Sequence, residues 1–378
     1  MPRVTKQSNP ARSRPSPLAE LALIERIRLR AAKTPTPELR LGIGDDCALL
    51  RTAPGEEFAV TTDLSIAGRH FRLDWHPAES VGHRALARGL SDLAAMGARP
   101  VAAFLSLALP KALVQKPKPS SAAKAARGPR AERSAWIDRF LDGFLSLAHA
   151  HEVPLAGGDL AESPLAVADV ILTGAVRQEK ALLRSGARPG DLIYVTGKLG
   201  GAAAGFAYLS RLAAALKHNR SRSRVDALLR IPPRAMAVLN PHLYPKPRIA
   251  QGLWLARNGI ATAAIDLSDG LSTDLTHLCA ESSVAAELDA ASLPIAPAAN
   301  ALQMLHGGED YELLFTAPPG ARVPADIEGV RVTRIGRIVV ESQGRARKAR
   351  GQSAASSITL VTPAGAVPLA PQGWQHFS

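Results

Sequence analysis

The sequence predicts a mixed α/β protein of two domains, and three observations support this fold class. The chain has 378 residues, which is long for a single domain. Its composition is globular, with 46% hydrophobic and 21% charged residues, and its 30 glycines and 29 prolines follow no repeat. Apolar runs of strand length alternate along the chain with longer amphipathic stretches, as they do where strands alternate with helices.

The first domain is predicted to span residues 17–177, after a disordered tail over 1–16. An amphipathic helix is expected over 18–32, because the cluster of Pro35 and Pro37 must end it. The other elements expected in this domain are a strand over 58–65, a helix from Pro77 to Met96 with Gly97 as its C-cap, a strand over 101–109, a helix over 135–149, a short apolar run over 153–156 and a strand over 166–176.

The second domain is predicted to span residues 178–378. Two prolines, Pro245 and Pro247, form a rigid turn before one of its helices. The elements expected here are a strand over 192–196, a glycine-rich helix start over 197–206, a helix over 249–258, a strand over 260–265, a helix over 271–280, and strands over 311–316 and 331–339. The chain has no short tandem repeat, which argues against a solenoid or a propeller.

The net charge of +13 is concentrated in four segments that are poor in large apolar residues. They lie at 1–14, 111–133, 211–230 and 342–350 and together carry +19, so the remaining chain carries a net charge of −6. We expect the last three to be solvated basic insertions or loops. Aromatic residues, at 4%, are too scarce for a surface that stacks on single-stranded nucleic acid, so nucleic acid is not expected as a partner.

The two cysteines, Cys47 and Cys279, are consistent with a reduced, cytoplasmic location. They form neither a CxxC pair nor a cluster with histidine, so no disulfide framework or zinc finger is predicted. We interpret Cys47 as a small buried residue rather than a redox centre. The most apolar run, residues 101–109, is far shorter than the roughly 18 residues that a membrane span needs. No membrane role is expected.

Acidic residues recur beside glycine or small hydroxyl residues, repeatedly just after an apolar run. Strand ends in α/β folds bring distant side chains to one crevice. Glycine lets backbone N–H groups approach phosphate, and carboxylate and hydroxyl oxygens suit Mg²⁺. The six places are Gly44-Asp45-Asp46, Thr61-Thr62-Asp63, Ser91-Asp92, Gly158-Asp159, the segment from Asp266 to Gly270, and Gly308-Glu309-Asp310.

Any one of these places has an ordinary structural explanation, because Asp-Gly pairs form turns and a Ser or Asp before a helix is commonly its N-cap. Six together indicate a shared site. Converging carboxylates raise one another's pKa unless cations neutralise them, which favours several Mg²⁺ ions. The chain has neither a GxxxxGK[ST] loop nor the glycine-rich loop of protein kinases with its partner motifs. The sequence therefore predicts an ATP-using enzyme of another architecture.

Seven ordered motifs resemble those of the thiamine-monophosphate kinase family, which belongs to the same superfamily as aminoimidazole ribonucleotide synthetase. They are GIGDDCALL, TTDLSIAGRHF, LSDLAAMGARP, GGD, LLRSGARPGDLIYVTG, IDLSDGLSTDL and GGEDYELLF. The resemblance covers about residues 18–340, and GWQHF at 373–377. It implies the two-domain architecture of that superfamily, in which N-terminal sheets pair in a homodimer and ATP lies between the domains.

The resemblance implies phosphorylation of thiamine monophosphate to thiamine diphosphate, with ATP as co-substrate and several Mg²⁺ ions. Matched motif by motif, the implied Mg²⁺ ligands are Asp46, Thr61, Thr62, Asp63, Asp92, Asp159, Asp266 and Asp269. The implied ATP contacts are Gly158, Asp159, Arg184 and Ser268, and the implied contacts to thiamine monophosphate are His70, Glu309 and Trp374. The residue chemistry agrees at two positions, because Arg184 can pair bidentately with phosphate and Trp374 can stack on a cationic ring.

We expect no residue to act as a catalytic acid or base. The acceptor is a phosphate monoester that is ionised near neutral pH, so alignment and charge neutralisation should suffice for direct in-line transfer of the γ-phosphoryl group. The chain departs from the family at residues 160–163, where Leu-Ala-Glu-Ser replaces Thr-Thr-Arg-Gly, and at Gly89, which replaces Asn.

Two alternatives stay open at this point. One is another enzyme of the superfamily, which would use ATP to activate an amide or formyl group. The other is a non-catalytic protein that keeps the fold and binds an anionic partner through the basic segments.

Overall fold

The computed structural model describes residues 17–34, 36–43, 48–115, 135–215, 232–341 and 357–374, with side chains from residue 23 onward. The predicted tail over 1–16 lies outside the described residues, as do Asp46, Cys47, the basic segment 342–350 and most of the two other basic segments. The expectations for these residues stay predictions.

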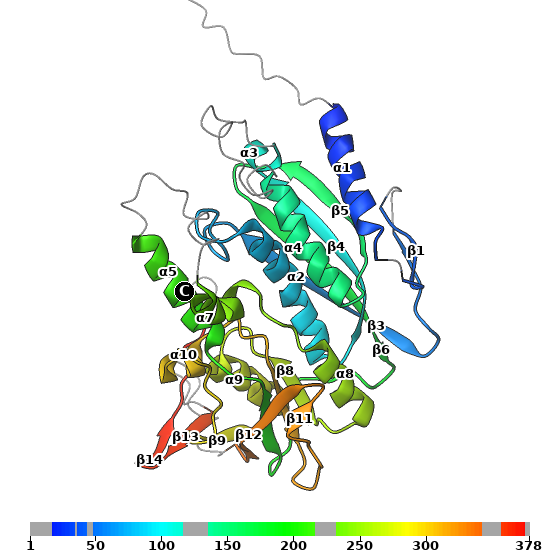
Figure 1. Ribbon diagram of the computed structural model, residues 1–378. Helices are drawn as coiled ribbons and strands as arrows, with labels where there is room; N and C mark the ends of the chain where they lie inside the picture. The colour runs from blue at the N-terminus through cyan, green and yellow to red at the C-terminus, as the bar shows by residue number, and fades with distance from the viewer. Residues whose placement is uncertain are drawn as a thin grey trace, which may run out of the picture.

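A four-stranded sheet with helices on one face forms the N-terminal half of the molecule (Figure 1). Helices α2 (Ala78–Ala95) and α4 (Trp136–Ala150) lie side by side on that face. In the sheet, β4 and β5 are parallel and the other neighbours are antiparallel. The strand order is β3 (Glu56–Ile66), β6 (Val167–Arg177), β4 (Arg99–Leu109) and β5 (Leu155–Glu162).

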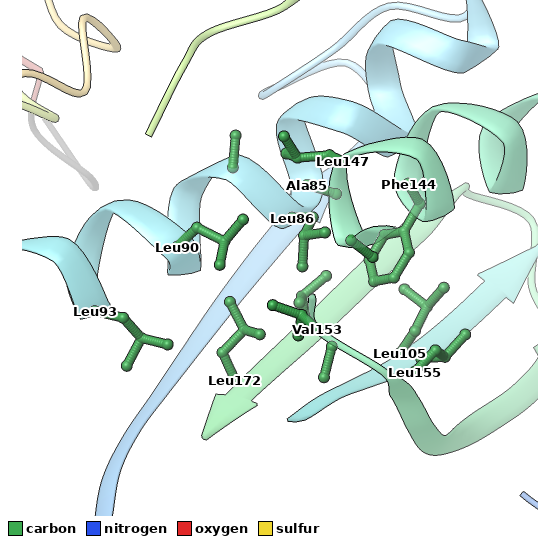
Figure 2. Packing of buried hydrophobic residues seen from close by; sticks show 14 of the residues in the cluster. Ala85, Leu86, Leu90, Leu93, Leu105, Phe144, Leu147, Val153, Leu155 and Leu172 are labelled. Carbon is green, nitrogen blue, oxygen red and sulfur yellow. The ribbon is translucent and has the colours of Figure 1, made fainter. Parts of the chain in front are cut away.

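The core of this half lies between the two helices and the sheet (Figure 2). Leu86, Leu90 and Leu93 recur along α2 at helical spacing, and all three are buried against strand residues such as Leu172. Phe144 of α4 fills the space beside them. The apolar face of α2 therefore packs on the sheet, and its other face is available to polar residues.

Glycines let α2 and α4 approach each other closely. A Cβ atom at Gly82 would lie 1.9 Å from the backbone oxygen of Phe140, and one at Gly143 would lie 1.8 Å from the backbone oxygen of Glu79. Near this contact, Nε of Arg139 lies 2.9 Å from the carboxylate of Glu79. The position of α2 is thus fixed by backbone contact as well as by side-chain packing.

The opposite face of the sheet presents apolar side chains on β3. Phe58, Val60 and Leu64 are 49%, 63% and 47% exposed. They alternate with Ala59, Thr61 and Asp63, which lie on the face toward α2, as the period of a strand requires. A small sheet of β1 (Leu39–Leu41) and β2 (Leu49–Leu50) packs on another part of this outer face, over Val101 and Ala156.

The C-terminal half contains a larger, mostly antiparallel sheet, in which only β13 and β9 pair in parallel. Along the sheet the order is β14 (Gly365–Pro368), β13 (Ile358–Thr362), β9 (Ala285–Asp289), β12 (Val330–Val339), β7 (Leu192–Thr196), β10 (Leu313–Ala317) and β8 (Ala263–Asp266), with β11 (Asp326–Ile327) paired to β12. The helices of this half are α5 (Gly201–Ala215), α7 (Pro233–Leu243), α8 (Ile249–Asn258), α9 (Leu271–Ser282) and α10 (Ala301–His306).

One hydrophobic core extends across both halves, and the C-terminal half has a second core of its own. The cluster that contains Leu86 and Phe144 continues into Leu255 of α8 and Phe315 of β10. Helix α8 packs on α2 at Gly252, where a Cβ atom would lie 2.0 Å from the backbone oxygen of Ala94. The proposed domain boundary at residue 177 stays a prediction, and α2 is the element that both halves contact.

The expected fold class is confirmed, and each element predicted within the described residues is present. Helix α1 (Pro17–Ala31) and the short helix α3 (Lys111–Val114) complete the N-terminal half. The run over 153–156 leads into β5, which continues through Glu162, so Gly158 and Asp159 lie inside a strand. Sequence reasoning missed the longer elements α7, α10, β9, β13 and β14 and the short elements β1, β2, α3 and β11.

Replacing Gly143 by alanine should destabilise the fold by about 1–3 kcal/mol, because the added methyl group would overlap the backbone of α2. Urea unfolding of the purified chain measures the change. Gly320→Ala is the matched control, since nothing lies within 4 Å of a Cβ atom there. Equal stabilities for the two variants would contradict the close helix contact.

Candidate active site

A cleft with a volume of about 380 Å³ lies where α2 meets the C-terminal half. Its walls come from β3 and α2, from the start of α9, from α5 and α7, and from residues 308–311. The polar side chains that line it are Asp63, Arg69, His70, Arg88, Asp92, His242, Asp266, Ser268, Asp269, Glu309 and Tyr311, and Trp374 lies at its edge from the C-terminal segment.

Helix α2 organises the acidic floor of the cleft. Arg88 and Asp92 lie four residues apart and therefore share a helix face. Nη2 of Arg88 lies 3.1 Å from the carboxylate of Asp63 on β3, and the hydroxyl of Thr61 donates to Asp92. The neighbouring Ser91 donates a hydrogen bond of 2.7 Å to Asp266 at the end of β8. Three chain segments are thus tied together through their carboxylates.

These carboxylates hold their protons more tightly than ordinary aspartates. Burial raises the pKa of Asp63 to about 6, against the opposing effect of Arg88, and the charge of Asp92 adds to the rise. Burial and repulsion from Asp92 raise the pKa of Asp266 to about 7. Burial also raises the pKa of Asp92, against its hydrogen bond from Thr61. The floor is therefore an environment that a cation would stabilise.

A second cavity of about 280 Å³ lies on the other side of this floor. It contains Thr61, Asp92, Arg184 and Asp266, with apolar walls from Met96 and neighbouring residues. Asp92 and Asp266 line both cavities. Arg184 lowers the pKa of both carboxylates, although burial outweighs it. The second cavity combines a guanidinium group with apolar surface beside the shared carboxylates.

The loop before α9 is ordered by hydrogen bonds to its own backbone. The carboxylate of Asp274 accepts from the N–H groups of Asp269 and Gly270, at 3.0 and 2.9 Å. The C-terminal segment then docks on this loop, because the N–H of Trp374 donates to the backbone oxygen of Asp269 at 3.1 Å and that of Gly373 donates to Thr273 at 3.0 Å. Trp374 is thereby held at the cleft.

Glu309 projects from a strained turn on the opposite wall. Its backbone has a φ of 66°, in the left-handed region that non-glycine residues rarely adopt. Its carboxylate accepts from Arg84, and Nδ1 of His242 lies 3.4 Å from it. Burial alone would raise the pKa of Glu309, but Arg84 and His242 hold it well below its ordinary value. The group is an anion at the pH of the cell.

Two buried histidines support Arg84 behind the cleft. Nη1 of Arg84 lies 3.0 Å from Nε2 of His242 and 3.2 Å from Nε2 of His76. Burial and the charge of Arg84 lower the pKa of His242 to about 4 and that of His76 well below its ordinary value. Both imidazole rings are therefore neutral, and in this cluster the positive charge of Arg84 faces the negative charge of Glu309.

Comparisons with known proteins identify the family. Residues 44–176 match the family model "AIR synthase related protein, N-terminal domain", and residues 188–348 match the model of the corresponding C-terminal domain. The thiamine-monophosphate kinase of Escherichia coli K12 is 38% identical over 340 residues, which is 86% of this chain and 92% of the relative. This chain belongs to the thiamine-monophosphate kinase family.

Solved structures of the kinase family have the same fold. That of the thiamine-monophosphate kinase from Stenotrophomonas maltophilia is 38% identical, with a TM-score of 0.67 over 86% of this chain and 95% of that one. A structure described as AaThiL complexed with AMPPCP and TMP is 26% identical, with a TM-score of 0.65 over 97% of this chain and 100% of that one.

The structure brings most of the residues expected for the family's site together. Those that line the cleft are Asp63, His70, Asp92, Asp266, Ser268, Asp269, Glu309 and Trp374, and Thr61 and Arg184 line the second cavity. Their roles as ligands stay predictions. The expectation that acids follow strands holds only in part, because Asp63 lies inside β3 and Asp92 inside α2.

Three residues expected in the kinase site line neither cavity. Thr62 lies on the exposed outer face of β3, opposite to Thr61 and Asp63. Asp159 accepts from the N–H of Leu160 at 2.8 Å on β5. Gly158 packs against β4, where a Cβ atom would lie 1.9 Å from the backbone oxygen of Leu105. Their ligand roles, like that of Asp46 outside the described residues, stay predictions.

Several lining residues were not predicted. Arg88 had a usable signal, because it precedes Asp92 by one helical turn on a helix that was expected. His242 had none, since α7 was not predicted and carries Pro241 inside the helix. Tyr311 lines the cleft, and Arg84 supports Glu309, only because the two halves pack together. No local sequence pattern indicates such contacts.

The chemistry of the floor fits Mg²⁺. Within the described residues, no three His, Cys, Asp or Glu side chains form a group that would hold a metal by themselves. Mg²⁺ does not require one, because it is usually bound by one or two carboxylates together with water and substrate phosphates.

Among the described helices, none is long and apolar enough to cross a membrane.

His242 should make a pH-dependent contribution to the stability of the protein. Its folded pKa of about 4 lies below the unfolded value, so its contribution is lost as the pH falls from about 6.5 toward 4, whereas the raised pKa values of Asp63 and Asp266 act in the opposite sense. The contribution of the histidine is up to about 1.4 kcal/mol per pH unit. In urea unfolding across this range, the stability of His242→Gln relative to the wild type should therefore rise as the pH falls, whereas that of His149→Gln, at an exposed position, should stay constant. Parallel curves for wild type and His242→Gln would overturn the assignment.

Proposed function

We propose that this chain transfers the γ-phosphoryl group of ATP to thiamine monophosphate and so forms thiamine diphosphate. The observation that carries the proposal is one cleft that joins a floor of carboxylates to a wall bearing Glu309 and Trp374, in a chain of this kinase family. The carboxylate floor suits phosphates with their bound cations, and the wall suits an organic cation. The reaction needs both kinds of surface, one for the phosphates and one for thiamine monophosphate.

The proposed metal ligands within the cleft are Asp63, Asp92, Asp266 and Asp269. Bound cations would offset the free-energy cost of burying these carboxylates and of their mutual repulsion, so folding and metal binding favour each other. When bound, Mg²⁺ neutralises charge on the phosphate oxygens and fixes their positions. We propose several ions, in line with the number of carboxylates.

The nucleotide is proposed to extend from the second cavity into the cleft. The guanidinium of Arg184 can pair with phosphate oxygens, and the apolar surface near Met96 can receive a base. Asp92 and Asp266, which line both spaces, mark where the phosphates pass from one to the other. Ser268 lies at the far end of the same path.

Thiamine monophosphate is proposed to bind between His70, Glu309 and Trp374. Glu309 is kept ionised by Arg84 and His242, so it can face the cationic thiazolium ring. The indole of Trp374 offers a face for stacking or for a cation–π contact. This placement would direct the monophosphate toward the carboxylate floor, where Arg88 can help to neutralise it.

The chain's own residues would accelerate transfer by alignment and by charge complementarity. The acceptor oxygen is already deprotonated, so no side chain has to remove a proton. Holding both phosphates in line converts a bimolecular encounter into a reaction between bound groups. Direct in-line transfer without a phosphoenzyme is therefore proposed.

We also propose a homodimer that is formed through the outer face of the N-terminal sheet. Phe58, Val60 and Leu64 form an exposed apolar row on β3, and such a row is commonly covered by another chain. The face continues onto β6, which pairs with β3 along the whole length of both strands, so a second sheet could pack across the two.

The activity is tested by incubating the purified chain with ATP, Mg²⁺ and thiamine monophosphate and measuring thiamine diphosphate. Asp63→Asn should lower turnover by about a hundredfold or more while leaving unfolding nearly unchanged, because its carboxylate is proposed to hold an ion. Asp289→Asn, at the exposed end of β9, is the control. Absence of product from the wild type, beside free thiamine and aminoimidazole substrates, would end the proposal.

The dimer is tested by sedimentation of the wild type and Phe58→Glu. The variant should shift toward the monomer, since a carboxylate in an apolar sheet contact costs several times the thermal energy to bury. Leu302→Glu serves as the control, because Leu302 is also apolar and exposed but lies on α10. A wild type that sediments as a monomer at micromolar concentration would refute this interface.

A further inference from the structure

A third cavity, of about 650 Å³, lies in the C-terminal half and shares no lining residue with the other two. Its wall comes from the loop after β7, the turn between α7 and α8, the segment after β9 and the start of β12. The side chains that matter for its chemistry are those of Lys198, Lys246, Arg248, Ser292, Arg331 and Thr333.

Four of these side chains are cationic, and none of the described residues that line the cavity is acidic. Lys198, Lys246 and Arg331 come from three separate segments, and within the described part of the chain none of them forms an ion pair. Three uncompensated cations around one hollow repel one another, and an anion inside it would relieve that repulsion.

The fourth cation is held in a fixed position. Arg248 donates to the carboxylate of Glu312 through Nε at 2.6 Å and through Nη2 at 2.5 Å. The hydroxyl of Thr196 also donates to Glu312, at 2.7 Å, so the carboxylate is anchored from both sides. Glu312 thus neutralises the charge of Arg248. The positive charge that remains at the cavity is that of Lys198, Lys246 and Arg331.

We propose that this cavity binds a small anion that carries a diphosphate group or two phosphate groups. The three unpaired cations match the charge of about −3 that a diphosphate group carries near neutral pH. A ligand with a single carboxylate carries too little charge to match them. The cavity's volume is within the roughly 300–1,000 Å³ of small-molecule sites. Its lining comes from four segments around one open hollow, a shape that suits a compact anion better than the extended backbone of a nucleic acid.

The test is calorimetric titration of the full chain with inorganic pyrophosphate in the presence of a chelator. Without divalent cations the acidic floor of the active site repels an anion, whereas the basic cavity does not. The wild type should show saturable binding that weakens as salt is raised. Absence of saturable binding would overturn the proposal.

Variants locate the binding. The double variant Lys246→Gln/Arg331→Gln should lose affinity by about tenfold or more, because each charged contact to phosphate contributes strongly. Arg188→Gln/Arg257→Gln, which removes two exposed cations elsewhere, should bind as the wild type does. Equal affinity in both double variants would place pyrophosphate at another site and refute the assignment. Should the first double variant unfold, Lys198→Gln alone carries the same expectation and the same refutation.

Discussion

Repulsion between buried carboxylates is the constraint on which the arrangement of this molecule depends. Asp63, Asp92 and Asp266 come from a strand, a helix and the end of a second strand in the other half, yet they line one cleft. Folding brings them together at a cost, since burial and mutual charge raise their pKa values. The hydrogen bonds from Thr61 and Ser91 and the ion pair with Arg88 offset part of that cost and leave the rest to bound cations.

Helix α2 makes this arrangement possible because it serves both halves. One face packs Leu86 and Leu90 against the sheet, and backbone contacts at Gly82 and Gly252 fix its position against α4 and α8. The face that remains carries the polar residues of the site. A helix that is held on three sides can keep charged groups in place at a junction where a loop would move, which is the requirement for aligning two phosphates.

The sequence predicted the elements with a regular pattern and the acids with a local signature. Asp63, Asp269 and Glu309 were found because each lies beside glycine or small hydroxyl residues, whereas Thr62 and Asp159 share that signature but face elsewhere. Strand alternation explains Thr62. Arg84 and His242 could not be found, because their function in the cluster comes from packing between the halves. Helix α7 contains a proline that conceals it, and β13 and β14 are short strands whose pairing is set by distant neighbours.

The alternation along β3 has a consequence for how this chain tolerates change. Odd-numbered positions from Ala59 to Asp63 face α2 and line the second cavity or the cleft, and the even-numbered Phe58, Val60 and Leu64 are exposed on the outer face. Insertion or deletion of one residue at the beginning of the strand would exchange the two rows, moving Asp63 out to the surface and an apolar side chain into the carboxylate floor. A change in the length of this strand would therefore disturb both rows at once, whereas a substitution alters a single position in one row.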